Sequence, residues 1–173
     1  MHPAAISLHL VSGSLFGANK IPVDPVFFIQ SRPICRVISA CYIGSQLCGH
    51  PGFVHGGLLS LLFDDVFARC ASIAFDSGVG MTANLKIDFR KPSIPDRLYV
   101  YRAEVVETEG RKMRMVGQMR SLKSFRPEEM IKRAVATHEG VGIEEEEGEL
   151  VAEASALFVE PKSTQSMVAL YPK

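Results

Sequence analysis

The alternation of apolar and polar residues divides the chain into one long apolar stretch and several shorter alternating ones. Residues 56–75 are apolar around nearly the whole circumference of a helix, which predicts a helix covered by other structure on most sides. In residues 81–90 the period changes to two, with every odd position apolar and every even position polar. This second pattern predicts a strand with one face on a core.

Further strand patterns lie on both sides of the helix. They cover residues 26–29, 36–47, 99–108, 112–120 and 150–159. The predicted core faces of the last two consist of Met113, Met115, Gly117 and Met119, and of Leu150, Ala152, Ala154, Ala156 and Phe158. Antiparallel strands joined by short turns form a sheet with one dry face, which only the single apolar helix can cover. The predicted fold is therefore α+β: a curled antiparallel sheet wrapped around one central helix, the hotdog arrangement.

Prolines and charges set the expected domain limits. Residues 1–34 contain three interrupting prolines and form a predicted irregular N-terminal segment. The predicted domain covers residues 35–160, and residues 161–173 form a C-terminal tail. An insertion at 123–149 contains opposite charges at i,i+4 spacing, which predict a short exposed helix over 127–133.

Composition limits the classes of function. The 173 residues carry no formal net charge, so the molecule as a whole has no electrostatic case for binding nucleic acid. No segment reads as a membrane span, because the long apolar stretch holds three charges. The four cysteines form no CxxC pair and read as reduced residues. With no signal-peptide pattern at the start, we expect a cytoplasmic location, with a mitochondrial one as the alternative because the first twenty residues are poor in acids.

The candidate chemistry lies where a loop meets the apolar helix. The loop, residues 49–57, contains two histidines and ends in a glycine pair, and the helix carries Asp64, Asp65 and Arg69. A buried carboxylate is costly unless it is paired. Arg69 is at i+4 from Asp65, the favoured spacing for an ion pair on a helix, and at i+5 from Asp64. Asp65 is therefore predicted to be structural, which leaves Asp64 available for chemistry.

Several separate motifs carry a family resemblance that covers most of residues 35–160. The first is Pro-Gly-x-x-His-Gly-Gly, with an Asp nine residues after the His. The others are Met-Thr-Ala-Asn-Leu at 81–85, Phe-Arg-Lys-Pro at 89–92, Glu-Gly-Arg-Lys at 109–112 and Ala-Glu-Ala-Ser-Ala-Leu-Phe at 152–158. In this order they resemble the hotdog-fold acyl thioesterases, and fungal acyl-CoA thioesterase-like proteins in particular.

The resemblance implies roles for individual residues. Asp64, Gly56, His55 and Thr82 match catalytic positions, Thr82 being where relatives carry a Ser or Thr near the catalytic water. The resemblance places the His55 side chain near the substrate carbonyl, although His55 could instead simply cap the helix. Relatives often have Asn or Gln six residues before the His; this chain has Gly49 there, and the neighbouring His50 could substitute.

The residues themselves suit thioester hydrolysis. A helix that starts at Gly56 and Gly57 presents unpaired N–H groups and the positive end of its dipole, which would stabilise the oxyanion of an attacked thioester. A carboxylate can act as general base or as nucleophile, and the sequence leaves both open. Gly56 and Asp64 lie about 12 Å apart along the helix at ~1.5 Å per residue. If both act on one carbonyl, they come from two antiparallel copies, so a homodimer or a dimer of dimers with composite sites is expected.

Substrate and partner classes follow from charge. Two basic pairs, Arg90–Lys91 and Arg111–Lys112, lie at predicted sheet corners, where they suit the phosphates of coenzyme A or an acidic carrier protein; solvated strand-end charges are the alternative interpretation. The expected substrate is thus an acyl-CoA or a carrier-protein-bound acyl or polyketide chain, the latter in fungal secondary metabolism. We expect no cofactor and no metal, because Cys48, His50 and His55 match no standard metal spacing. The alternatives are a hotdog dehydratase or hydratase, and a non-catalytic acyl-CoA binder.

Overall fold

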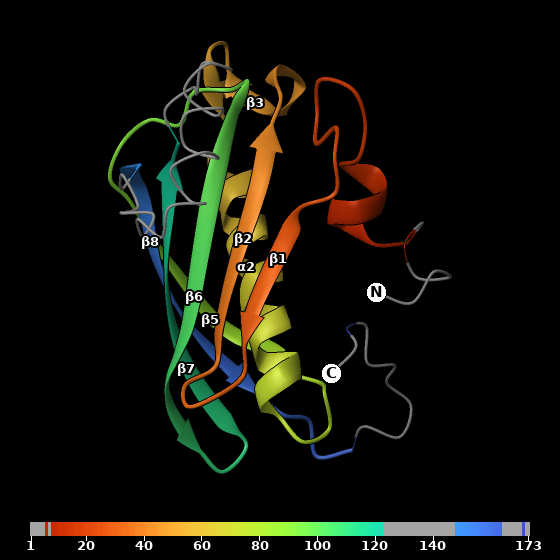
Figure 1. The fold of residues 1–173 in the computed structure, drawn as a ribbon, viewed down its shortest axis with the longest axis vertical. Helices are drawn as coiled ribbons and strands as arrows, with labels where there is room; N and C mark the ends of the chain where they lie inside the picture. The colour runs from red at the N-terminus through yellow and green to blue at the C-terminus, as the bar shows by residue number, and fades with distance from the viewer. Residues whose placement is uncertain (1–5, 7, 123–147, 164–170, 172–173) are drawn as a thin grey trace, which may run out of the picture.

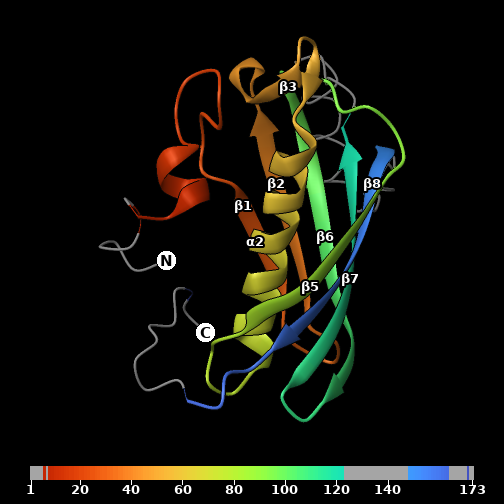
Figure 2. The same ribbon diagram turned by 180° about the vertical axis from the view of Figure 1, so that it is seen from behind.

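The computed structural model describes residue 6, residues 8–122 and 148–163, and residue 171. Its main body is a six-stranded antiparallel sheet with the order β1-β2-β6-β7-β8-β5, curled around helix α2 (Figure 1). The strands of this sheet are β1 (Val26–Gln30), β2 (Arg36–Ile43), β5 (Met81–Phe89), β6 (Arg97–Glu109), β7 (Lys112–Ser121) and β8 (Glu149–Val159). The view from behind shows α2 (Gly56–Ala74) lying along one face of the sheet (Figure 2).

Among the described residues, four short elements lie outside the main sheet. One π-helical turn, η1 (Leu10–Ser14), precedes β1, and a 3-10 turn, η2 (Ser45–Leu47), follows β2. The small hairpin of β3 (Cys48–His50) and β4 (Phe53–Val54) then leads directly into α2. The predicted fold is confirmed: one helix against a curled antiparallel sheet that does not close into a barrel.

The core lies between α2 and the central strands. Strands β2 and β7 bury every second residue, and the three methionines of β7 are at most 1% exposed. The fourth member of the predicted β7 face, Gly117, provides space for the helix, because a Cβ there would lie 2.9 Å from the Phe67 ring. Period-two alternation therefore identified the buried faces of the central strands correctly.

Two strand details differ from the prediction. Strand β2 ends at Ile43 rather than at 47, because the Gly44 N–H donates to the Lys20 carbonyl outside the sheet and residues 45–47 form the 3-10 turn η2. The pairing of β7 with β8 shifts by one residue, since Met119 pairs with Ala152 and Arg120 pairs with Leu150. The residue that is skipped, Val151, lies on the buried face of β8 and is 1% exposed. Leu150, predicted to lie in the core, is only half-buried.

Strand β5 is an edge strand and is less covered than its pattern predicts. Its apolar residues Leu85 and Ile87 are only half-buried, and Phe89 is 54% exposed. The prediction of a strand with one face on a core is thus only partly met within the chain. The short helix expected over 127–133 lies outside the described residues. Within the described part of the chain, no helix is long and apolar enough to cross a membrane.

Candidate active site

His55 terminates the loop and caps α2. It is the N-cap residue, with φ −64° and ψ 126°, and its Nδ1 accepts a hydrogen bond of 2.9 Å from the Gly57 N–H. The amides of Leu58 and Leu59 donate to the His55 carbonyl oxygen at 2.9 and 3.3 Å. Of the first four helix amides, the Gly56 N–H is left without an acceptor among the described residues. Of the two glycine amides at the start of α2, that of Gly57 is therefore used by the cap.

The two glycines beside His55 make room for its ring. A Cβ on Gly49 would lie 2.7 Å from His55 Cδ2, and one on Gly57 would lie 2.9 Å from the ring. The Asn or Gln of relatives therefore has no space at position 49 in this loop. Since Nδ1 accepts a hydrogen bond, the neutral ring carries its proton on Nε2, where it remains available as a donor on an exposed side chain. His50 lies on β3 and stacks on Phe53, with ring centroids 6.3 Å apart.

Asp64 and Thr82 are brought together from two elements. The Thr82 hydroxyl donates to Asp64 Oδ1 over 2.6 Å, from the start of β5 to the middle of α2. This contact requires Thr82 to face the helix, although the alternating pattern placed it on the polar, outward face. The difference has a structural cause: Thr82 pairs with buried Phe158, and the register shifts before Asn84 pairs with Leu157. The resulting β-bulge at Ala83 turns Thr82 inward.

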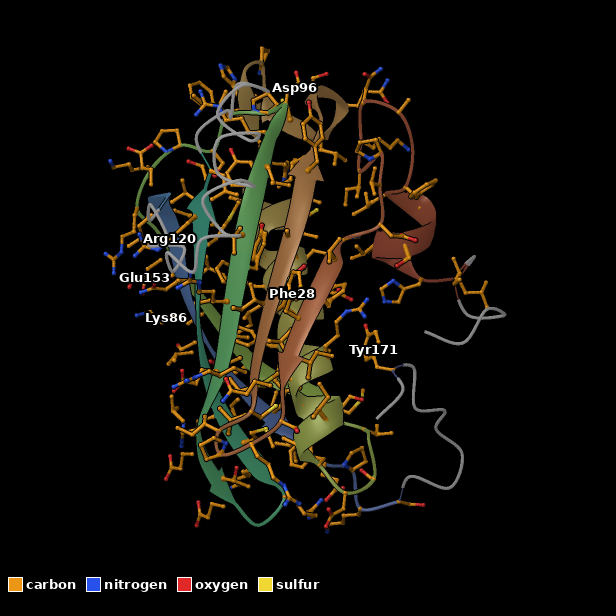
Figure 3. The ribbon with its side chains drawn as sticks, in the orientation of Figure 1. Phe28, Lys86, Asp96, Arg120, Glu153 and Tyr171 are labelled. Atoms are coloured by element: carbon orange, nitrogen blue, oxygen red, sulfur yellow. The ribbon has the colours of Figure 1, made fainter. Side chains whose placement is uncertain are left out.

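Asp65 is the structural acid, as its spacing from Arg69 predicted. It is 8% exposed, and its Oδ2 accepts a hydrogen bond of 3.1 Å from Arg69 Nε. Two residues from the ends of the chain complete its surroundings. The Tyr171 hydroxyl donates to Asp65 Oδ1 at 2.8 Å, and His9 Nε2 lies 3.3 Å from the same oxygen. Figure 3 shows Tyr171 beside α2, on the opposite side of the molecule from Glu153 of β8.

The electrostatics of this cluster favour the charged acid. The Ser12 N–H donates to His9 Nδ1, so the ring directs its Nε2–H toward Asp65. Burial in itself raises the pKa of Asp65, but the hydrogen bond from His9, the charge of Arg69 and the hydrogen bond from Tyr171 outweigh it and hold the pKa below its usual value. Burial and the Asp65 charge raise the pKa of Tyr171, which therefore remains a donor.

Aromatic rings complete the Asp65 cluster. The Arg69 guanidinium carbon lies 3.6 Å from the Phe27 ring centroid and 4.2 Å from that of Tyr171. Nothing in the sequence indicates these rings or His9, because residues 9, 27 and 171 show no pattern that links them to the helix. They are distant in sequence and meet only in the fold.

A groove of about 450 Å³ opens beside the free Gly56 amide. Phe53, Leu59, Phe89 and Pro92 supply its apolar wall. The Phe89 ring lies against the glycine, and a Cβ on Gly56 would be 3.3 Å from its Cζ. The two predicted catalytic groups therefore contact opposite ends of β5, since Thr82 near its start holds Asp64 and Phe89 at its end lies against Gly56. A larger cavity of about 800 Å³ lies on the sheet face away from α2 and includes neither Asp64 nor Gly56.

The two basic pairs do not form one surface on a single chain. Lys112 aligns with Val159 and so with the Met81 end of β5, whereas Arg90 and Lys91 follow its other end. The nine residues of β5 separate them by about 30 Å at ~3.3 Å per residue. Arg90 also pairs with Glu153 at 2.7 Å, and Lys91 pairs with Glu149. The Arg111 side chain donates to the Glu160 carbonyl at 2.9 Å. In the described part of the chain, no three metal-ligating side chains gather.

Comparison with known proteins gives a consistent family. Residues 51–124 match the model of the thioesterase superfamily. A Candida albicans protein described as uncharacterized and mitochondrial is 27% identical over 151 residues, which is 87% of this chain and 59% of that protein. MIOREX complex component 3 of Saccharomyces cerevisiae is 35% identical over 64% of this chain and 41% of its own. Rat acyl-coenzyme A thioesterase THEM4 is 38% identical over 45% of this chain and 33% of its own.

Solved structures agree on the fold. AziG of S. sahachiroi superposes with a TM-score of 0.58 at 16% identity, covering 79% of this chain and 90% of that one. A hypothetical thioesterase from Streptococcus pneumoniae, solved with coenzyme A, superposes with a TM-score of 0.56 at 16% identity. The superposition covers 78% of this chain and 87% of that one. The chain spans only 33–59% of the length of the three relatives above.

Proposed function

We propose that this chain, whose residues 51–124 match the model of the thioesterase superfamily, hydrolyses an acyl thioester to a free acid and a thiol. The observation that carries the proposal is the hydrogen bond from Thr82 to Asp64 at the open edge of the sheet. It fixes the carboxylate through Oδ1, and Oδ2, which has no hydrogen-bond partner among the described residues, can take a water molecule or attack the thioester carbon. Both proposed roles of Asp64, general base and nucleophile, use that second oxygen.

The second part of the proposed mechanism is the free amide of Gly56. As a thioester carbonyl is attacked, negative charge collects on its oxygen. A helix N-terminal N–H that is not used by the protein stabilises that charge without rearrangement. The exposed Nε2–H of His55 is a second donor at the same helix end. The resemblance that placed His55 near the substrate carbonyl thus agrees with its capping role, since the cap uses Nδ1.

The Asp64 carboxylate and the Gly56 amide can belong to one site only in a dimer. Within one chain they are about 12 Å apart along α2, which is too far for both to act on one carbonyl. We propose that β5 pairs with β5 of a second copy in antiparallel orientation, since it is an edge strand with exposed apolar residues. A two-fold axis near the middle of β5 then brings the start of one strand beside the end of the other. Gly56 of each copy would meet Asp64 of its partner, and each dimer would have two sites.

This dimer would also bring the basic pairs closer together. Arg90 and Lys91 of one copy would approach the strand end that carries Arg111 and Lys112 of the other. Such a surface suits the phosphates of coenzyme A or an acidic carrier protein, and a polyketide chain in fungal secondary metabolism remains one proposed substrate. A mitochondrial location gains support over a cytoplasmic one from the name of the Candida relative.

The activity is tested by presenting the chain with acyl-CoA and carrier-bound acyl substrates of varied length and aromaticity. A hydrolase releases free thiol from at least one substrate class. A dehydratase or hydratase would instead change the absorbance of an enoyl thioester without releasing thiol, and a non-catalytic binder would do neither. Either of these two results would overturn the proposal.

The composite site is tested by mixing two inactive variants. Gly56→Pro lacks the amide, and Asp64→Asn lacks the carboxylate. If the chains refold together at equal amounts, half of the dimers contain one of each, and one of their two sites is intact. We expect about a quarter of the wild-type activity. If the mixture stays as inactive as each variant alone while mass measurement confirms mixed dimers, the two groups act within single chains.

A further inference from the structure

Two cysteine sulfurs lie in contact in a part of the core that the proposed hydrolysis does not use. Cys35 precedes β2, and Cys70 lies in the second half of α2. Their Sγ atoms are 3.3 Å apart, and each Sγ also lies within 3.7 Å of the other residue's carbonyl oxygen. Both thiols are free. Cys41 and Cys48 are free as well, and the Cys41 Sγ donates to the Tyr42 carbonyl.

We propose that Cys35 and Cys70 form a peroxide-reactive dithiol, which a hydroperoxide converts into a disulfide linking β2 to α2. The Cys35 thiolate attacks the peroxide O–O bond, gains one oxygen as a sulfenic acid and releases the other as water or an alcohol. The Cys70 thiol then attacks the Cys35 sulfur, so that the S–S bond forms, the S–O bond of the sulfenic acid breaks, and its oxygen leaves as water. In total, two thiols and one hydroperoxide give one disulfide, one alcohol or water, and one water molecule.

The two cysteines have different surroundings that match these roles. Cys35 is 8% exposed and Cys70 is fully buried, so a small oxidant reaches Cys35 first. The hydrogen bond with Cys70 lowers the pKa of Cys35 and outweighs the effect of burial, whereas the same contact and burial raise the pKa of Cys70. Cys35 is thus the attacking thiolate, and Cys70 is the resolving thiol that is already in position.

Closing the bond needs little movement. An S–S bond is about 2.05 Å long, so the two sulfurs must approach by about 1.3 Å in total, within reach of small side-chain rotations. The bond would close a ring around residues 36–69, which contain the loop with His55, the free Gly56 amide and both helix acids. Oxidation would therefore constrain the unfolded chain across the whole segment that carries the site.

Trypsin separates the relevant cysteines and makes the test direct. Because Arg32 precedes a proline and resists cleavage, Cys35 falls in peptide 21–36, Cys70 falls in peptide 70–86, and Cys41 and Cys48 share peptide 37–69. The full-length protein is treated with hydrogen peroxide, its remaining thiols are alkylated under denaturing conditions, and the peptides are identified by mass. The variants are Cys35→Ser and Cys35→Ala, with Cys48→Ser as the matched control.

We expect peptides 21–36 and 70–86 to be joined in the wild type and in Cys48→Ser, and the link to disappear with dithiothreitol. The crosslink should raise Tm by about 4–16 °C, and neither Cys35 variant should show the rise. Oxidation of Cys48 alone, sulfinic acid on Cys35 without a link, or no reaction at Cys35 would each overturn the proposal. The wild-type peptide map decides the question even if both Cys35 variants fail to fold.

Discussion

The two acids of α2 are adjacent in the chain but lie on different sides of the helix, with different surroundings. Asp65 faces β1, where Arg69, His9 and Tyr171 bind both of its oxygens in a nearly dry cluster. Asp64 faces the open edge at β5, where Thr82 binds one oxygen at an exposed position. A carboxylate whose oxygens are all bound by protein groups holds a structure together, whereas one with a free oxygen can act on a ligand. The number of partners distinguishes the two roles better than residue type does.

The largest effect should come from removing the Asp64 charge. Asp64→Asn keeps the size of the side chain and its hydrogen bond with Thr82, but it removes the base or nucleophile. We expect kcat of thioester hydrolysis to fall by about 10²–10⁴-fold, with Tm almost unchanged. Free-thiol release and thermal unfolding on the same preparation measure both. If Asp64→Asn retained the wild-type kcat, Asp64 would be neither the general base nor the nucleophile.

Gly56→Pro should produce the next largest effect. Proline is well accepted at the first position of a helix, and the ψ of 126° at His55 suits the residue before a proline. The substitution thus removes the free N–H with little damage to α2, and kcat should fall by about 10²–10³-fold. Gly56→Ala is the matched control, because it adds the same Cβ against Phe89 and keeps the N–H. Equal losses in the two variants would assign the effect to crowding instead.

Asp65 should affect stability far more than chemistry. Asp65→Asn leaves the partly buried Arg69 without its counter-charge, and breaking a buried pair costs about 3–5 kcal/mol of the free energy of unfolding. For a chain of this length, this corresponds to a fall in Tm of roughly 6–20 °C. Hydrolysis below the transition should stay within a few-fold of the wild type. A stable Asp65→Asn variant without hydrolysis would reverse the roles of the two acids.

His55 should give the smallest effect, and it tests whether the ring does more than cap the helix. Asn is a favoured N-cap residue, so His55→Asn should preserve Tm but lose the Nε2–H donor, and kcat/KM should fall about tenfold. His55→Ala loses the cap as well and should cost about 1 kcal/mol of stability in addition. If His55→Asn retains full kcat/KM, the ring serves only the helix.

The periodicity of apolar residues was sufficient to predict most of the fold, because each central strand of the sheet has one dry face and one wet face. The spacing of Asp65 and Arg69 also predicted their ion pair, since four residues make one turn of a helix. Periodicity failed where the physical cause lies in another strand. The inward turn of Thr82 and the burial of Val151 both result from register shifts against a neighbouring strand. His9 and Tyr171 were missed because residues near the two chain ends reach Asp65 only through the tertiary fold.

The bulge at Ala83 means that strand length, as well as side-chain identity, encodes the candidate site. One residue more or fewer between Thr82 and Leu85 would point the hydroxyl away from Asp64 and leave every neighbouring residue type unchanged. A relative could therefore keep the Asp, the Thr and the His-Gly-Gly motif and still lack the contact. In alignments of this region, a single-residue gap in β5 deserves more weight than several substitutions.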